Sequence, residues 1–365
     1  MESHRGNVVF VFGAGASKAE GAPTSDELLL KSLTALRENE KVRDVIDFLK
    51  DFFFVDVHGL EQKVLPKFEE ILTMIDIALL RQDDLSREWN YNKLAEIRND
   101  LIYCIAKILD KTLRTGGSLH RKFVKNLFGD SERSCNNTAF INLNYDILLD
   151  NALIDLYPSK DWDVDYEIDF RNFVEAIRRT PEERAEFTRI PDRWHRPRKD
   201  RALRLLKPHG SLNWLYCPNC NTVKITKKEK GVLRIWTEFK TCELDDSPQR
   251  PLIVPPTWQK VHENSHLVRI WLRAAEVLRM ANIVFFIGYS LPDSDTTLKY
   301  LFKKFLYHDE RASTPLISVV LKEDEKLMET KMRYVHLFGK DVAFMCDGFE
   351  KFVNDPSVYQ SIPEK

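Results

Sequence analysis

The sequence predicts an α/β protein with a parallel sheet, one helical insertion and a small cysteine-bearing module. Its first apolar run, Val8 to Phe12, has no polar alternation, which is typical of a strand buried on both faces of a parallel sheet. Helical periodicity, as at 267–280, separates the later apolar runs, and this alternation favours the α/β class. The other candidate strands are 138–143, 202–206, 282–287, 314–321 and 342–345.

A glycine-rich turn, Gly13-Ala14-Gly15-Ala16-Ser17, follows the first strand. Its glycines permit a tight turn and a close approach to a ligand, and Ser17 with the following amides can face a phosphate. Lys18 stands where the strict dinucleotide fingerprint has its third glycine, and no P-loop signature follows. The turn therefore indicates either a nucleotide site or a tight connection without a ligand.

A helical insertion is predicted at 26–137, between the first and second strands. Thr24 or Ser25 can cap its first helix, and apolar residues then recur at helical spacing. Such a long detour is unusual for a strand–helix–strand crossover, whose connecting loops are short. The nucleotide-binding core is accordingly assigned to 1–25 and 138–365.

Polar residues stand at the ends of the later strands, where α/β sheets bind ligands. Asn144 and Asp146 follow the second strand, where they can serve a ligand or simply cap the next helix. His209 lies between proline and glycine after 202–206, and an imidazole there suits a general base. After the strand at 282–287, Ser290 can bind a ribose, whereas Asp295 is interpreted as a helix cap.

The small module, 214–250, contains a C-x2-C pair, Cys217 and Cys220. Only Cys242 follows, with Asp245 three residues on. Three cysteines and a carboxylate can bind zinc, although four cysteines, or three with a histidine, are commoner in structural sites. The module therefore either binds zinc or keeps the length of a zinc ribbon without its metal.

Composition sets limits on function. The 365 residues carry a formal net charge of −1, which gives no bulk electrostatic case for nucleic-acid binding. An arginine-rich segment, 193–204, is interpreted as a solvated loop or a subunit contact rather than a nucleic-acid patch. The six cysteines make no disulfide framework, which fits a reducing cytoplasm. No apolar stretch reaches the length of a membrane span.

Five motifs together resemble the sirtuin-like domains. They occur in that family's order from Gly13 to Pro292. They are GAGAS with the following Gly-Ala-Pro, Asn142-Leu143-Asn144-Tyr145-Asp146, Lys207-Pro208-His209-Gly210-Ser211, Cys217-Pro218-Asn219-Cys220 and Gly288-Tyr289-Ser290-Leu291-Pro292. The branch that the chain resembles most is that of bacterial anti-phage defence proteins, which cleave NAD⁺ and cause abortive infection.

The resemblance implies a sirtuin-like Rossmann variant that uses NAD⁺ as its substrate and releases nicotinamide and ADP-ribose. It implies that Asn144, Asp146 and His209 are catalytic. The residues implied in NAD⁺ binding are Gly13, Ala14, Gly15, Ser17, Pro23, Gly288, Tyr289 and Ser290. The metal ligands that it implies are Cys217, Cys220 and Cys242.

Departures from the family pattern keep other functions open. Asn142 replaces a threonine and Leu143 replaces the glutamine of deacetylases. Pro255-Pro256-Thr257-Trp258 stands where deacetylases have Phe-Gly-Glu, and proline lacks the N–H that strand addition with a peptide would use. The alternatives are an NAD-dependent protein deacetylase and a non-catalytic subunit that senses NAD⁺ or ADP-ribose.

The resemblance also implies control by assembly, because a defence enzyme must not consume NAD⁺ constantly. The expected form is a homo-oligomer, with a separately encoded partner such as a HerA-type ATPase or a short Argonaute. In the resembled proteins inserted helices carry subunit contacts or cover the site, although plain scaffold is an equal reading for any one helix.

Overall fold

The structure is a computed structural model. It describes residues 7–36, 38–55, 65–115, 117–129, 137–156, 163–172, 194–195, 202–225, 241–242, 244–254, 264–293, 295–306 and 314–360.

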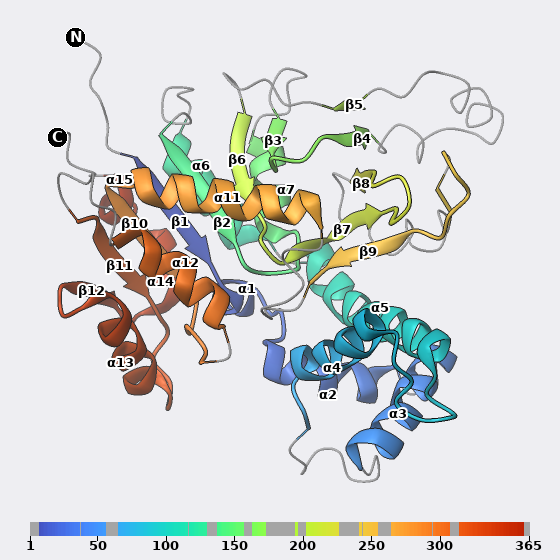
Figure 1. Ribbon diagram of the computed structural model, residues 1–365. Coiled ribbons are helices and arrows are strands. Elements are labelled where there is room, and N and C mark those ends of the chain that lie inside the picture. Colours follow the sequence, from blue (N-terminus) through green and yellow to red (C-terminus); the bar gives the residue numbers. More distant parts are fainter. Residues whose placement is uncertain are drawn as a thin grey trace.

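A seven-stranded sheet with strand order β12-β11-β10-β1-β2-β6-β3 forms the centre of the protein (Figure 1). Every neighbouring pair in it is parallel, which confirms the predicted fold class. β1 lies between β10 and β2 and is fully buried. The strands are β1 (Val8–Phe12), β2 (Thr138–Asn142), β3 (Asp163–Asp165), β6 (Ala202–Leu206), β10 (Ile283–Ile287), β11 (Leu316–Val320) and β12 (Val342–Met345).

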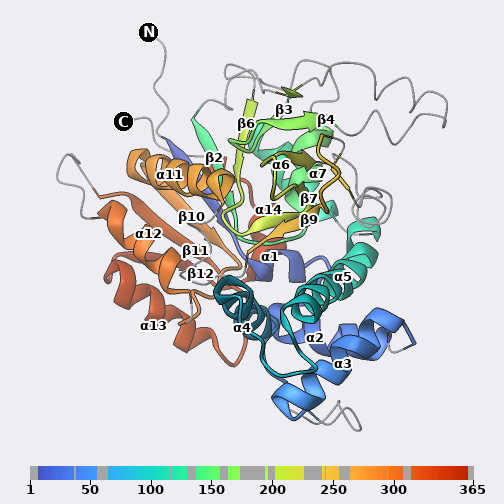
Figure 2. The ribbon, with the colours of Figure 1, turned by 45° about the vertical axis from the view of Figure 1, so that its right-hand side comes forward.

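Helices cover both faces of this sheet, and their apolar sides share one hydrophobic cluster with it (Figure 2). The first face carries α11 (Ser265–Met280), α12 (Thr296–Leu306) and α13 (Leu327–Phe338). The second face carries α6 (Ser118–Phe128), α7 (Leu148–Leu156) and α14 (Gly348–Asn354), with α1 (Ala14–Lys18) and α15 (Ser357–Gln360) nearby. The sheet is thus packed on both faces, which holds the loops at its ends in place.

A second sheet of five strands, in the order β5-β4-β8-β7-β9, stands beside the first. It is not among the predicted elements. Its strands are β4 (Phe170–Asn172), β5 (Trp194–His195), β7 (Gly210–Tyr216), β8 (Val223–Ile225) and β9 (Arg250–Ile253). β7 and β9 run antiparallel and carry the cysteine-bearing module between them.

Most of the predicted insertion forms a separate group of helices with its own hydrophobic cluster. These helices are α2 (Ser25–Ala35), α3 (Glu40–Phe53), α4 (Phe68–Arg81) and α5 (Tyr91–Thr115). Thr24 is the N-cap of α2, and its amide donates to the carboxylate of Glu27 at 3.2 Å, a capping box. The last helix of the predicted range, α6, packs with the main sheet instead.

Local interactions set the bounds of the last helices. α13 begins at Leu327, after a turn in which the side chain of Asp324 accepts the amide of Lys326 at 2.9 Å. α14 and α15 are separate helices, with Pro356 directly before the second.

Candidate active site

The carboxyl ends of β1, β2, β6 and β10 meet at one edge of the main sheet. The chain continues from β1 toward β2 on one side and returns to β10 on the other. The order of strands therefore reverses at β1, and this is the place where open α/β sheets bind their ligands. The predicted site residues come from the loops that follow these four strands.

The glycines of the first turn bring two backbones together. The amides of Gly13 and Gly15 donate to the carbonyls of Ile287 and Gly288 at 2.9 and 2.8 Å. A Cβ on Gly15 would lie 2.8 Å from Gly288, and one on Gly288 would lie 2.2 Å from the nitrogen of Ala16. The sequence predicted that these glycines let the backbone come close to a ligand. In the structure, Gly13, Gly15 and Gly288 instead let the turn after β1 come close to the turn after β10. Gly15 itself remains exposed.

Ser17, Asn144 and Asp146 form one hydrogen-bonded group that joins the β1 and β2 turns. The buried hydroxyl of Ser17 donates to Asp146 Oδ2 at 2.7 Å. Asn144 Nδ2 donates to Ser17 Oγ at 2.9 Å and to the carbonyl of Gly13 at 3.0 Å. Asp146 Oδ1 accepts the amide of Leu148 at 3.0 Å, so Asp146 also caps α7. Three predicted residues are therefore brought together, and capping accounts for part of the role of Asp146.

His209 sits in a buried, tightly held turn between β6 and β7. Its Nδ1 lies 3.3 Å from the carbonyl oxygen of Leu143, and because a carbonyl only accepts, Nδ1 carries the proton. Its own carbonyl accepts the amide of Val254 at 3.0 Å. Gly210 has φ +79°, and a Cβ there would lie 2.0 Å from the carbonyl oxygen of Leu252. The turn therefore requires glycine, as the motif has it.

The imidazole of His209 lies between two aromatic rings. The ring centroid of Tyr145 is 6.3 Å away and that of Trp271 is 6.4 Å away. Trp271 Nε1 donates to the carbonyl of Pro208 at 3.1 Å, so α11 holds the turn from one side. Among the residues that the structure describes, none is a hydrogen-bond partner of His209 Nε2.

A buried ion pair behind this turn was not predicted from the sequence. Lys207 Nζ donates to Asp150 Oδ2 at 3.1 Å, to Ser211 Oγ at 2.7 Å and to the carbonyl of Asp146 at 2.6 Å. Tyr166 donates its hydroxyl to the other oxygen of Asp150 at 2.8 Å. Burial raises the pKa of Asp150, and the ammonium of Lys207 opposes that shift. The ion pair fixes the start of α7 against the histidine turn.

The predicted residues after β10 divide between the surface and the interior. Ser290 is exposed, and its carbonyl accepts Arg333 Nη1 at 3.3 Å. Tyr289 is buried, and its hydroxyl donates to Asp295 Oδ2 at 2.6 Å. Pro23 is buried beside the cap of α2, and Ala14 is half-buried. Of these residues, Ser290 and Ala14 offer atoms at the open edge.

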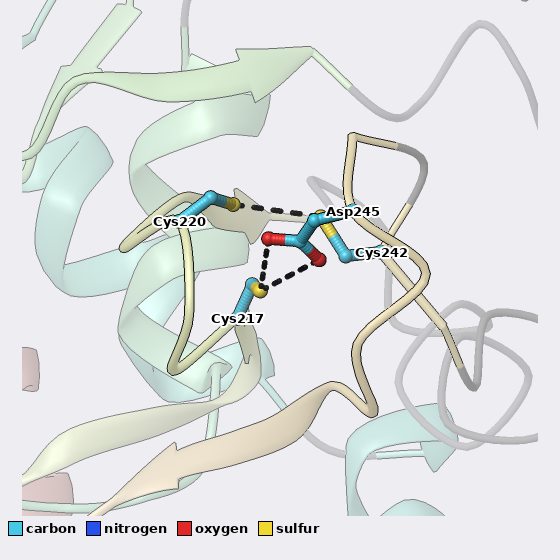
Figure 3. Close-up of side chains that lie close together, drawn as sticks. All are labelled: Cys217, Cys220, Cys242 and Asp245. Atoms are coloured by element: carbon cyan, nitrogen blue, oxygen red, sulfur yellow. Dashed lines mark hydrogen bonds between the residues drawn. The ribbon is translucent and has the colours of Figure 1, made fainter.

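A second cluster lies in the small module, where Cys217, Cys220, Cys242 and Asp245 gather (Figure 3). One potential ligand atom from each lies within 4.8 Å of all the others. Cys217 Sγ is 3.5 Å from both oxygens of Asp245, and the sulfurs of Cys220 and Cys242 are also 3.5 Å apart. The four side chains could hold a metal ion, since thiolates and carboxylates both bind zinc.

Two turns of the same geometry supply these ligands. In the first, the amide of Asn221 donates to the carbonyl of Cys217 at 3.0 Å, and Asn221 has φ +58°. In the second, the amide of Asp246 donates to the carbonyl of Cys242 at 2.9 Å, and Asp246 has φ +56°. Asp245 follows Cys242 by three residues, as Cys220 follows Cys217, so Asp245 occupies the position in the second turn that Cys220 occupies in the first.

The carboxyl of Asp245 is kept ready to act as a ligand. The amide of Ser247 donates to its Oδ1 at 3.0 Å and holds the pKa of Asp245 at about 2, well below its ordinary range. A metal ligand must be deprotonated, so this environment suits coordination.

Some predicted features lie outside the described residues. They include Pro255-Pro256-Thr257-Trp258 and most of the arginine-rich segment at 193–204. Within the described ranges no helix is both long and apolar enough to cross a bilayer.

No family profile and no curated protein matches the sequence. The structure is similar to a solved Sir2 homologue in complex with NAD, with a TM-score of 0.48 and 13% identity over 98% of this chain and 91% of that one. It is similar to a Sir2 homologue mutant with 2′-O-acetyl ADP-ribose, with a TM-score of 0.46 and 13% identity over 100% of this chain and 96% of that one. A third similar structure is a Sir2 protein bound to a propionylated peptide, with a TM-score of 0.44 and 14% identity over 99% of this chain and 95% of that one.

Proposed function

We propose that this chain is a sirtuin-like NAD⁺ hydrolase that releases nicotinamide and ADP-ribose. The observation that carries the proposal is the buried Nε2 of His209, which has no hydrogen-bond partner among the described residues and lies at the same sheet edge as the Ser17–Asn144–Asp146 group. A base that can accept a proton and a polar group fixed on neighbouring loops are what a hydrolytic site requires. The order of the five sequence motifs supports the choice of NAD⁺ as the substrate.

The reaction breaks the bond between C1′ of the ribose and the nicotinamide nitrogen, whose positive charge already activates it. The bonding electrons leave with nicotinamide, and a water adds to the oxocarbenium-like carbon that remains. In our proposal Asn144 orients the carboxamide or the water, and Asp146 binds the nicotinamide side of the substrate. His209 Nε2 accepts a proton from the water or from a ribose hydroxyl.

The open part of the edge would take the rest of the dinucleotide. Ala14 and Gly15 present the accessible face of the first turn, and Ser290 lies across from them on the β10 turn. The amides of Gly13 and Gly15 already donate to backbone carbonyls. We therefore assign to Gly13 and Gly288 the shaping of the phosphate site, and to Ala14, Gly15 and Ser290 the contact with substrate.

The first experiment measures NAD⁺ consumption by the purified chain and separates the products by chromatography. Nicotinamide and ADP-ribose should form in the absence of any acetylated peptide. The variant His209→Ala should lose turnover by a factor of about 10² to 10⁴, which is the usual contribution of a general base. Its melting temperature should fall somewhat, because the variant also loses the Nδ1 hydrogen bond to the carbonyl of Leu143 and the packing of a buried ring, so turnover is compared at a temperature where both proteins are folded.

Each alternative function gives a different product pattern. A deacetylase would consume NAD⁺ only when acetylated peptide is present and would form O-acetyl-ADP-ribose. A sensing subunit would bind NAD⁺ or ADP-ribose in calorimetry without turnover at any oligomeric state. Full turnover by His209→Ala would contradict the proposed base.

We further propose that the chain works as a homo-oligomer in bacterial anti-phage defence and that assembly, alone or with a separately encoded partner, controls turnover. Size-exclusion chromatography with light scattering tests the first part. A clean monomer at high concentration that hydrolyses NAD⁺ at full rate would contradict it.

We propose that the small module binds one structural zinc ion through Cys217, Cys220, Cys242 and Asp245. The two matching turns and the gathered ligand atoms support this assignment. The ion would hold the two ligand-bearing turns together, and it would take no part in the reaction.

A further inference from the structure

Two buried hydrogen-bond acceptors in the candidate active site have no donor within the part of the chain that the structure describes. One is His209 Nε2, and the other is Asp295 Oδ1. His209 is 5% exposed and Asp295 is 2% exposed, so bulk water does not satisfy them. Leaving a buried acceptor unpaired costs about 1–3 kcal/mol. A ligand with two donors would remove that cost at both atoms.

Asp295 has a structural role that uses only part of its carboxylate. It directly precedes α12, and the amide of Leu298 acts on it as expected at a helix N-cap. Its Oδ2 accepts the hydroxyl of Tyr289 at 2.6 Å, which fixes the orientation of the group. Oδ1 is left over after both interactions.

Asp295 and His209 belong to one cluster with Tyr145. The rings of Tyr145 and His209 are 6.3 Å apart. Burial raises the pKa of Asp295, and the nearby imidazole of His209 opposes that shift. Burial likewise raises the pKa of Tyr145, and the charge of Asp295 adds to it. The ring contact joins His209 to Tyr145, and the effects on the pKa values of Asp295 and Tyr145 indicate that Asp295 belongs to the same neighbourhood.

We propose that His209 Nε2 and Asp295 Oδ1 together accept the two hydroxyl groups of the nicotinamide ribose, an inference that rests on the proposed function. A vicinal diol offers two O–H donors from adjacent carbons, which suits two buried acceptors that belong to different loops at one edge of the sheet. A hydrogen bond to a carboxylate is charge-assisted and roughly twice as strong as one between neutral groups. Asp295 is then a substrate-binding residue that the motif comparison does not identify.

The experiment uses the full chain and a carbocyclic NAD⁺ analogue, in which carbon replaces the oxygen of the nicotinamide ribose ring. This probe keeps the diol and cannot be hydrolysed at C1′. Calorimetry compares the wild type with Asp295→Ser, since serine remains a good N-cap but its shorter side chain withdraws the acceptor. We expect the Kd to rise at least tenfold in Asp295→Ser, and by less in Asp295→Asn, which lacks only the charge.

The matched control is Asp293→Ser, two residues away on the same loop. Asp293 is 79% exposed and pairs with Lys299 at 2.7 Å. Its replacement should leave the Kd unchanged. A second probe, the same analogue without both hydroxyl groups of that ribose, should bind the wild type more weakly but should show no further loss with Asp295→Ser.

The outcomes separate this inference from the proposed function. Equal Kd values for the wild type, Asp295→Ser and Asp295→Asn would overturn the inference and leave Asp295 as a helix cap only. Tight binding with the expected losses, but no hydrolysis of NAD⁺ by the wild type, would uphold the diol site and overturn the hydrolase. No binding of the analogue by the wild type would overturn both.

Discussion

At the scale of single residues, the glycine-rich turn and α1 after it are anchored by the carboxylate of Glu20, which is buried. Glu20 accepts hydrogen bonds from the amides of Gly117 and His120 and pairs with the His120 ring, at the start of α6. The His120 ring packs between Phe12 and Phe349, with centroids 5.6 and 5.1 Å away. Although burial opposes ionisation, the interactions with His120 and Gly117 hold the pKa of Glu20 below its ordinary value.

This arrangement predicts a pH-dependent loss of stability in Glu20→Gln. A depressed pKa stabilises the fold at a pH above the ordinary value of 4.5, and that contribution disappears as the pH falls through the folded-state value. At pH 7 the free energy of unfolding should fall by about 1–3 kcal/mol in the variant. Below pH 4.5 the gap between wild type and variant should narrow.

Urea unfolding at a series of pH values measures this difference. The matched control is Glu323→Gln, since Glu323 is exposed to solvent. The control should stay close to the wild type at every pH. If the difference in free energy of unfolding between the wild type and Glu20→Gln did not change with pH, the charge of the carboxylate would make no contribution to stability.

The sequence was sufficient to place three candidate site residues at one edge of the sheet, because each follows the end of a strand. Asn144, Asp146 and His209 follow short apolar strands, and the carboxyl ends of parallel strands share one edge. Lys207 could not be predicted as a buried residue, because lysine is almost always exposed unless it is paired. Its partner Asp150 lies on α7, and only the fold brings the two charges together.

At the scale of elements, the small module shows how local geometry can reveal a ligand set. The turn at 217–221 contacts α11, since Asn221 Nδ2 donates to Ser265 Oγ at 2.8 Å and its carbonyl lies 2.7 Å from His266 Nε2. The same helix carries Trp271, which holds the histidine turn through Pro208. The proposed metal site is thus linked to the proposed active site through one helix.

Removal of the metal ligand Asp245 is therefore expected to affect both stability and turnover. Elemental analysis of the purified protein should find about one zinc per chain in the wild type and much less in Asp245→Ala. Loss of the ion should lower the melting temperature, because an ion that binds only the folded state stabilises it. Turnover should fall with it, as the support for α11 is lost.

The control for this experiment is Asp246→Asn. Asp246 is the exposed neighbour in the same turn, and asparagine tolerates its positive φ. It should keep the metal. A wild-type protein that contains no zinc after growth in zinc-supplemented medium would overturn the metal proposal.

The elements that escaped prediction are short and paired at a distance. β8 has three residues and β5 has two, which is too few for a periodic pattern to be recognised. The strands of the second sheet also find their partners across long stretches of chain, as when β4 pairs with β8. By contrast, the predicted strands are β1, β2, β6, β10, β11 and β12, and each of them is a mostly apolar run in the main sheet.

At the scale of the whole molecule, the helices α2 to α5 are more than an appendage. Their hydrophobic cluster includes Tyr145, Ile147 and Leu148 of the β2 turn, next to Asp146. Arg98 of α5 donates to the carbonyl of Ile253 in β9 at 3.0 Å. Both ribbon views place these helices at the end of the sheet toward which the strands point (Figures 1 and 2). A movement of the helices α2 to α5 can therefore shift the residues next to Asp146, because both belong to the same hydrophobic cluster.

The position of β1 has a consequence for how the chain is made. Val8 pairs with Thr138 on one side and with Ile283 on the other, so both neighbours of this apolar strand are synthesised long after it. At about 5–20 residues per second, the ribosome delivers β10 on the order of 10 to 60 s after β1. During that interval the apolar strand β1 has an unpaired edge that can associate with other chains. Nascent chains of this protein should accordingly depend on chaperones, and co-expression of chaperones should raise the soluble yield.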